Sequence, residues 1–156
     1  MLIGTGALLI IVLLFLLGLY LQSHRETKDT EILSLADRWM ASGMAGQCPA
    51  YARARELYLQ VMHRHFQDRD LAGKAGVAGE LASLCGTDLQ PVIQARQAVL
   101  AAGTPAAMDV KSLALAQLAA GDRAGAFQTL ARMPEDEFCN WLAGWLHAIP
   151  ALARSE

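Results

Sequence analysis

The sequence has few of the residues that most enzymes and metal proteins depend on. Of its 156 residues, 18% are charged, 6% are aromatic and three are cysteine. It has no Gly-x-Ser-x-Gly elbow, no glycine-rich phosphate loop and no Cys-x-x-Cys pair. The net charge is −2 and no block of Lys and Arg supplies the basic surface that nucleic acids require. We therefore expect a protein that is not an enzyme and has no cofactor, no metal and no nucleic-acid partner.

Several side chains that can bind a metal occur in His63-Arg64-His65, followed by Asp68 and Asp70. His63 and His65 are two residues apart, which on a helix separates their side chains by about 200° around the axis. The two imidazoles therefore cannot easily bind the same ion. Cationic side chains near a helix C-terminus also fit the helix dipole. We interpret this stretch as a solvated helix end.

The longest uncharged run is at the N-terminus. Residues 1–22 contain no charged side chain and are mainly Leu and Ile. A helix of about 20 apolar residues matches a hydrocarbon core of about 30 Å, which predicts a transmembrane anchor. A cleaved signal peptide is the alternative, but the start has no basic residue and Tyr20 to Ser23 is a poor cleavage site. Abundant Ala, Leu, Gly and Arg are typical of a GC-rich bacterium, so we predict a single-pass protein of the bacterial inner membrane.

The rest of the chain is expected to be one all-α domain. Residues 23–30 are polar and resemble a juxtamembrane linker, with Thr30 as the N-cap of the next helix. Period-2 alternation is nearly absent from residues 31–152, and residues 153–156 form a short tail. Caps, glycines and prolines predict seven helices in this domain. They start after Thr30, at Pro49, at Leu71, after Asp88, at Thr104-Pro105, after Asp122 and at about Glu135.

Two of the predicted interhelical turns share a spacing. Gly86 and Gly121 are 35 residues apart, and Leu113 to Leu130 reads as a helix, a Gly-Asp turn and a second helix with Ala126 five positions after the glycine. This segment resembles the tetratricopeptide repeat, whose period is about 34 residues. The resemblance implies about three helical hairpins and a capping helix. An ordinary helical bundle with coincidental glycine spacing is the alternative.

The resemblance also implies a binding surface, because such arrays present a concave face to peptides or proteins. With Gly86 and Gly121 as fixed points, the residues expected to face this groove are Glu80, Ser83 and Lys111.

The last helix carries an apolar stripe that includes Trp141 and Trp145. These tryptophans are either core residues or a docking face. The predicted function is a membrane-tethered adaptor or assembly factor for one or more membrane-associated proteins. The alternatives are an accessory subunit of a larger membrane complex and, less favoured, an enzyme with an unrecognised site.

The cysteines and the charges near the apolar run predict opposite compartments. In the hairpin arrangement, Cys48 and Cys85 lie on one edge, where a disulfide would indicate an oxidising compartment, although two free thiols are an equal alternative. Arg25 and Lys28 follow the apolar run, which favours a cytoplasmic domain by the positive-inside rule. Cys139 lies among apolar residues and is expected to be buried.

Overall fold

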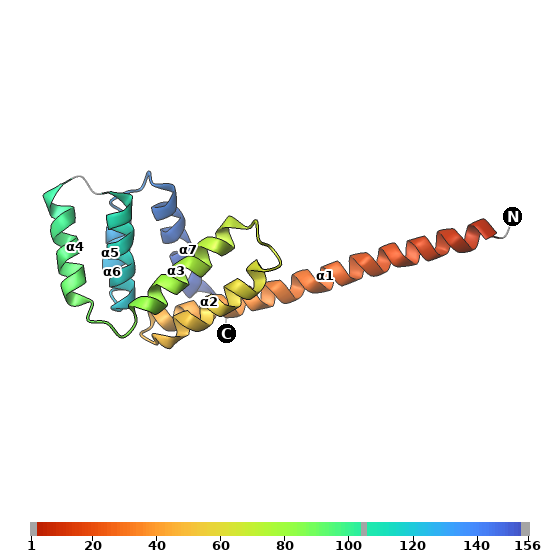
Figure 1. The fold of residues 1–156 in the computed structure, drawn as a ribbon, viewed down its shortest axis with the longest axis horizontal. Helices are drawn as coiled ribbons and strands as arrows, with labels where there is room; N and C mark the ends of the chain where they lie inside the picture. The colour runs from red at the N-terminus through yellow and green to blue at the C-terminus, as the bar shows by residue number, and fades with distance from the viewer. Residues whose placement is uncertain (1–2, 104–105, 154–156) are drawn as a thin grey trace.

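The structure, a computed structural model, describes residues 3–103 and 106–153, and these ranges contain helices and no strand. The expected all-α fold is thus confirmed. One long helix projects from a cluster of six shorter ones, so that the first turns of the long helix lie far from the cluster (Figure 1). The helices are α1 (Ile3–Met44), α2 (Pro49–Met62), α3 (Arg69–Leu84), α4 (Gln90–Ala102), α5 (Ala107–Ala119), α6 (Arg123–Leu130) and α7 (Glu137–Ala153).

The predicted transmembrane anchor is wrong. Within the ranges that the structure describes, no helix combines the length and the apolar character needed to cross a membrane. Residues 3–22 are also not a separate element, because they continue into the polar residues of the same 42-residue helix. Large apolar side chains along the first part of α1 are exposed. They include Ile10, Leu14, Phe15, Leu17, Tyr20 and Leu21.

The predicted linker at residues 23–30 is wrong for a related reason. These residues include no glycine and no proline, so nothing in them interrupts a helix that is already formed. Thr30 is consequently not an N-cap. Its hydroxyl donates to the backbone carbonyl of Glu26, one turn earlier in α1, at 2.9 Å.

The second half of α1 is fixed to the cluster by packing and by a buried carboxylate. Ala36 and Met40 are fully buried in the shared core, where α1 packs against α2 and α7. Asp29 is 7% exposed and accepts hydrogen bonds from Arg64 and His65 in the α2–α3 connection. Since a buried carboxylate requires such partners, Asp29 fixes this connection against α1.

Helices α2 and α3 form the next layer, beside α1. Cys48 at the start of α2 and Cys85 at the end of α3 are joined by a disulfide with 5.7 Å between their Cα atoms. The disulfide therefore links the start of α2 to the end of α3, at the opposite end of the helix pair from the α2–α3 connection.

Helix α5 occupies the centre of the remaining cluster and packs against α3, α4 and α6. Its residues from Leu113 to Leu118 are all buried. Helix α6 buries Ala126 completely, and the Thr129 hydroxyl donates to the Gln117 amide oxygen at 2.7 Å. Asp122 caps α6 by accepting from the Gly125 amide. This hairpin lies where the sequence predicted it. The predicted helix start at Thr104-Pro105 and the last tail residues, 154–156, lie outside the described residues.

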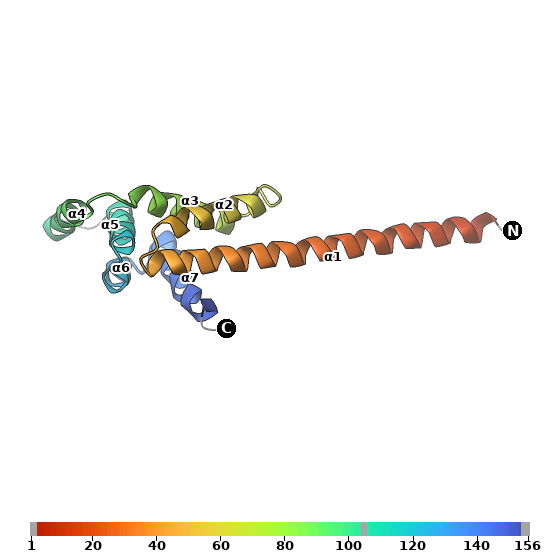
Figure 2. The same cartoon turned by 90° about the horizontal axis from the view of Figure 1, so that it is seen from below.

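The predicted row of three hairpins is not the observed arrangement. Gly86 and Gly121 both have φ of 82°, a left-handed conformation that glycine adopts readily after a helix. Only the turn at Gly121 leads into a packed hairpin, because α4 packs mainly on α5 instead of α3. Arg96 on α4 pairs with Asp109 on α5 at 2.8 Å. The last helix, α7, then returns to cross α1, so the ends of the cluster meet instead of opening into a solenoid (Figure 2).

Candidate partner-binding site

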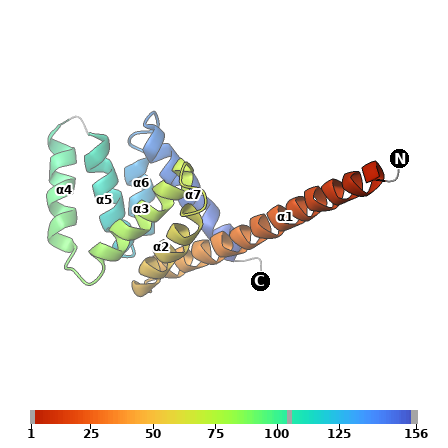
Figure 3. The same cartoon turned by 45° about the vertical axis from the view of Figure 1, so that its right-hand side comes forward.

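Aromatic and charged side chains from three helices come together where α3, α5 and α7 meet. Helix α3 lies beside α5 at one end and approaches the first turns of α7 at the other (Figure 3). We call this region the α3–α5–α7 face. It is defined by Asp70, Lys74, Glu80, Lys111, Phe138 and Trp141.

The aromatic part of this face follows from the helical spacing of α7. Leu142 and Ile149 are buried in the core and Trp145 is 8% exposed, while Phe138 and Trp141 lie at the edge of the same stripe and are half-buried. The ring centroids of Phe138 and Trp141 are 5.4 Å apart, and those of Trp141 and Trp145 are 5.6 Å apart. These three rings form a continuous aromatic row that runs from the surface into the core.

Charged side chains border the row on both sides. Lys111 on α5 pairs with Glu80 on α3 at 2.9 Å, and its ammonium lies 4.8 Å from the centroid of Phe138. Lys74 lies 5.9 Å from the centroid of Trp145. An ammonium over an aromatic face is a favourable contact. The arrangement joins three helices through interactions that remain accessible to a partner.

Trp141 is held in one orientation. Its indole Nε1 donates to Asp70 Oδ1 at 2.7 Å. Gly73 allows this close approach, because a Cβ at that position would lie 2.9 Å from the Trp141 ring. A groove of about 470 Å³ opens beside the ring, with Phe138 and Glu137 among the residues that line it. A fixed aromatic side chain next to an open groove is well suited to recognition, since little side-chain entropy is lost on binding.

The charge of Asp70 is stabilised by its two donors. Burial alone would raise the pKa of this carboxyl, but hydrogen bonds from Lys74 and Trp141 hold the pKa below its usual range. Lys74 donates to Asp70 at 2.7 Å. Asp70 therefore stays ionised and keeps Trp141 in place over the ordinary pH range.

Replacing Trp141 by phenylalanine should raise the pKa of Asp70, because one donor to its charged form is lost while Lys74 remains. An NMR titration of the Asp70 carboxyl carbon measures this change. Trp145→Phe is the control, because Trp145 donates toward Asp37 instead of Asp70. An unchanged Asp70 titration in Trp141→Phe would show that the indole does not hold this carboxylate in solution.

The residues predicted from the sequence are only partly brought together. Glu80, Lys111 and Trp141 lie on the α3–α5–α7 face. Ser83 donates its hydroxyl to the backbone carbonyl of Glu80 at 2.7 Å. Trp145 is nearly buried, so it supports the face from below.

Sequence reasoning missed Lys74, Phe138 and the role of Asp70 in this face. Asp70 and Lys74 are four residues apart on one helix, a spacing that itself indicates an ion pair. No spacing along the chain could place Phe138 under Lys111, because that contact joins α7 to α5.

The cysteines fall into two kinds. Cys48 and Cys85 form the disulfide, whereas Cys139 is a free thiol that is 1% exposed. Burial and the nearby Asp136 raise the pKa of the Cys139 thiol to about 11. Since the thiolate is the reactive form, Cys139 reacts slowly in the folded protein.

The residues considered as a metal site, from His63 to Asp70, make hydrogen bonds within the protein instead. His65 Nε2 lies 3.0 Å from Asp29, and Asp68 caps α3 by accepting from the amides of Asp70 and Leu71. Within the described ranges, no group of three His, Cys, Asp or Glu side chains is arranged to hold a metal ion.

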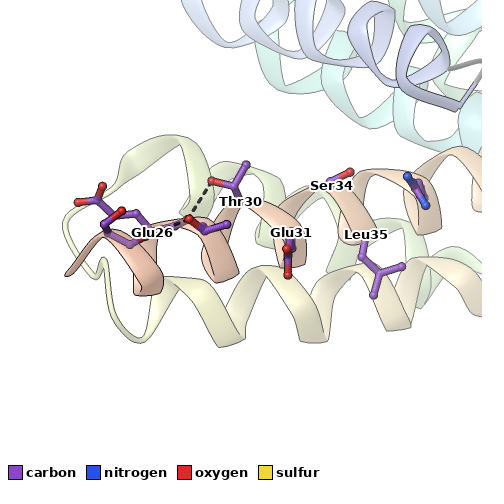
Figure 4. Close-up of a pocket in the computed structure, with 8 residues that line it drawn as sticks. Glu26, Thr30, Glu31, Ser34 and Leu35 are labelled. Carbon is purple, nitrogen blue, oxygen red and sulfur yellow. Dashed lines mark hydrogen bonds between the residues drawn. The ribbon is translucent and has the colours of Figure 1, made fainter. Parts of the chain in front are cut away.

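A second hollow lies along α1, and only residues of that helix line it. The close-up shows the side chains of Glu26, Thr30, Ser34 and their neighbours spread along the helix (Figure 4). The Thr30 hydroxyl donates a hydrogen bond to the backbone carbonyl of Glu26. One exposed helix surface does not enclose a ligand. The α3–α5–α7 face is the better candidate.

Comparison with known proteins gives no family for this chain. No protein-family model, no curated protein and no solved structure matches it. The resemblance to tetratricopeptide repeats therefore rests on residues 113–130 and the two glycines alone.

Proposed function

We propose that this chain is a protein-interaction adaptor or assembly factor that binds a protein partner through the α3–α5–α7 face. The observation that carries the proposal is the fixed, half-buried Trp141 beside an open groove. Tryptophan is enriched among the residues that dominate binding energy at interfaces. Around it, accessible ion pairs such as Glu80 with Lys111 supply polar contacts at the rim.

The charged groups of this face also fit recognition better than catalysis. Asp70 pairs with Lys74, and Glu80 pairs with Lys111, so each carboxylate stabilises a neighbouring cation. A catalytic acid or base instead needs a pKa near the working pH. The pKa of Asp70 is lowered, away from that range.

A second candidate function, an accessory subunit of a larger complex, is favoured by the exposed apolar side chains of α1. Phe15 is 65% exposed and Leu14 is 64% exposed, in a stretch of similar residues from Ile10 to Leu21. Contiguous apolar surface of this extent marks a contact site in most proteins. In this function other subunits would cover the stretch, and the helical cluster would brace them.

The disulfide supports an oxidising compartment for the helical cluster. We therefore propose an extracytoplasmic location, which reverses the preference drawn from Arg25 and Lys28. Localisation at the inner membrane of a bacterium stays a prediction. Cell fractionation tests it by measuring how much of the protein is recovered with that membrane.

Crosslinking in intact cells followed by mass spectrometry tests the adaptor function. We expect recovery of one or a few proteins in reproducible stoichiometry. Reversing one charge, as in Lys111→Glu, should reduce the recovery several-fold because it removes a cation from the proposed contact surface and leaves Glu80 facing another carboxylate.

The double variant Glu80→Lys with Lys111→Glu is the matched control for stability. It keeps an ion pair between α3 and α5 but reverses its direction, so the fold should melt near the wild-type temperature. Reduced recovery in both variants supports this face as the contact surface. Unchanged recovery in both would place the interface elsewhere, with the exposed stretch of α1 as the next candidate.

A further inference from the structure

We propose that the α3–α5–α7 face binds an arginine side chain of its protein partner, with the guanidinium over the ring of Trp141 and its N–H groups directed to Glu137. This inference rests on the proposed function, because it names what the partner presents. The arginine contact can be absent while the α3–α5–α7 face still binds a protein partner.

The aromatic row provides the first argument. Its outer rings each have a cation from the chain itself, Lys111 over Phe138 at 4.8 Å and Lys74 near Trp145 at 5.9 Å. Trp141 is the middle ring, and the structure gives it no such cation within the residues it describes. Tryptophan has the most favourable face for a cation among the aromatic side chains. Trp141 is thus the tryptophan of the row that lines the open groove, and no cation of the described residues lies over it.

The charge around the groove provides the second argument. Asp70, Asp136 and Glu137 line it, while Arg69 is the single basic residue among the lining residues. Asp136 also caps α7, accepting from the Cys139 amide at 2.8 Å, and Asp70 is paired with Lys74. Glu137 is an exposed carboxylate in the first turn of α7. Carboxylates beside an aromatic face favour a cationic ligand over an anionic one.

The geometry favours arginine over lysine. A guanidinium is planar and can stack on an indole while its edge donates two parallel hydrogen bonds to a carboxylate. Glu137 and Trp141 are four residues apart on α7, so their side chains lie on the same side of that helix. An ammonium group is more strongly hydrated and makes no such paired contact.

The test uses the full chain and N-acetyl-arginine methylamide as the probe. The indole N–H signal of Trp141, identified by its loss in Trp141→Phe, should shift in a saturable way as the arginine amide is added. The citrulline amide has the same shape without the charge and should give no saturable shift at the same concentrations. The lysine amide should bind more weakly than the arginine amide, by about threefold or more.

Two variants locate the contact. Glu137→Gln should weaken the apparent affinity by about threefold, because it removes an exposed charge partner. Glu135→Gln is the matched control, since Glu135 is exposed nearby but does not line the groove, and it should leave the affinity unchanged. Arg69 could compete for the ring, so Arg69→Ala should bind the arginine amide at least as tightly as the wild type.

Equal shifts with the arginine and citrulline amides, or a larger shift with the glutamate amide, would overturn the proposal. So would the absence of a shift in both the wild type and Arg69→Ala. A shift seen only in Arg69→Ala supports the site, with Arg69 as its internal occupant. If the arginine amide fails while partner recovery still depends on Glu80 and Lys111, the adaptor function stands and only the arginine contact is lost.

Discussion

Glutamate in place of Ala126 should unfold most of the helical cluster at temperatures where the wild type is folded. Ala126 is fully buried between α6 and its neighbours, and a charged side chain there would lose its hydration without gaining a partner. We expect a loss of about 3 kcal/mol or more in the free energy of unfolding. Thermal melts followed by circular dichroism measure it.

Ala124→Glu is the matched control. Ala124 lies on the same short helix and is exposed, so the same substitution there should change the free energy of unfolding by about 0.5 kcal/mol or less. If Ala126→Glu melts like Ala124→Glu, then α6 does not pack on the cluster through Ala126.

Reduction of the disulfide is the second large expected effect. Cys48 and Cys85 are 37 residues apart in the sequence, and the bond restricts the unfolded chain over that length. By chain entropy, opening it should lower the free energy of unfolding by about 4 kcal/mol. The urea midpoint, measured with and without a reductant, reports this loss.

The double variant Cys48→Ser with Cys85→Ser controls for other effects of the reductant. Its urea midpoint should equal that of the reduced wild type and should not respond to the reductant. Alkylation gives an independent reading, since Cys48 and Cys85 in protein isolated from cells should label only after reduction, while the buried Cys139 stays protected. Labelling of Cys48 and Cys85 without a reductant would contradict both the bond and the oxidising compartment.

Local sequence signals predicted the helices themselves well. Pro49 begins α2, Asp122 caps α6, and Gly86 and Gly121 follow helix ends in the same left-handed conformation. These features depend on residues within one turn of each other, so the sequence contains the information directly.

The arrangement of the helices was harder to predict. Equivalent turns at Gly86 and Gly121 suggested equivalent hairpins, but the partner of a helix is decided by contacts between distant residues. Helix α4 packs on α5, and the pair of Arg96 with Asp109 is one of the contacts between them. Residues 23–30 were wrongly predicted as a linker because polar side chains are also compatible with a helix that continues from upstream.

Three residues of the candidate face were named from the sequence, whereas its geometry was not. Trp141, Glu80 and Lys111 were named from the sequence, and they lie on one face of the structure. That face combines α3 and α5, each the first helix of a predicted hairpin, with α7, which was predicted to be a separate capping helix. Contacts such as Lys111 over Phe138 cross between helices and have no signature in the spacing of residues.

The uninterrupted course of α1 fixes a rotational relation along the chain. Each residue of an α-helix turns the backbone by about 100°, so the exposed stretch before Gln22 and the packed stretch after Asp29 keep a constant angular offset. One residue added between them would swing the α3–α5–α7 face about a quarter of a turn around the axis of α1, whereas four added residues would return it close to its original direction. The direction in which the α3–α5–α7 face points relative to the exposed stretch of α1 is therefore set by the number of residues in this segment, independently of their chemistry.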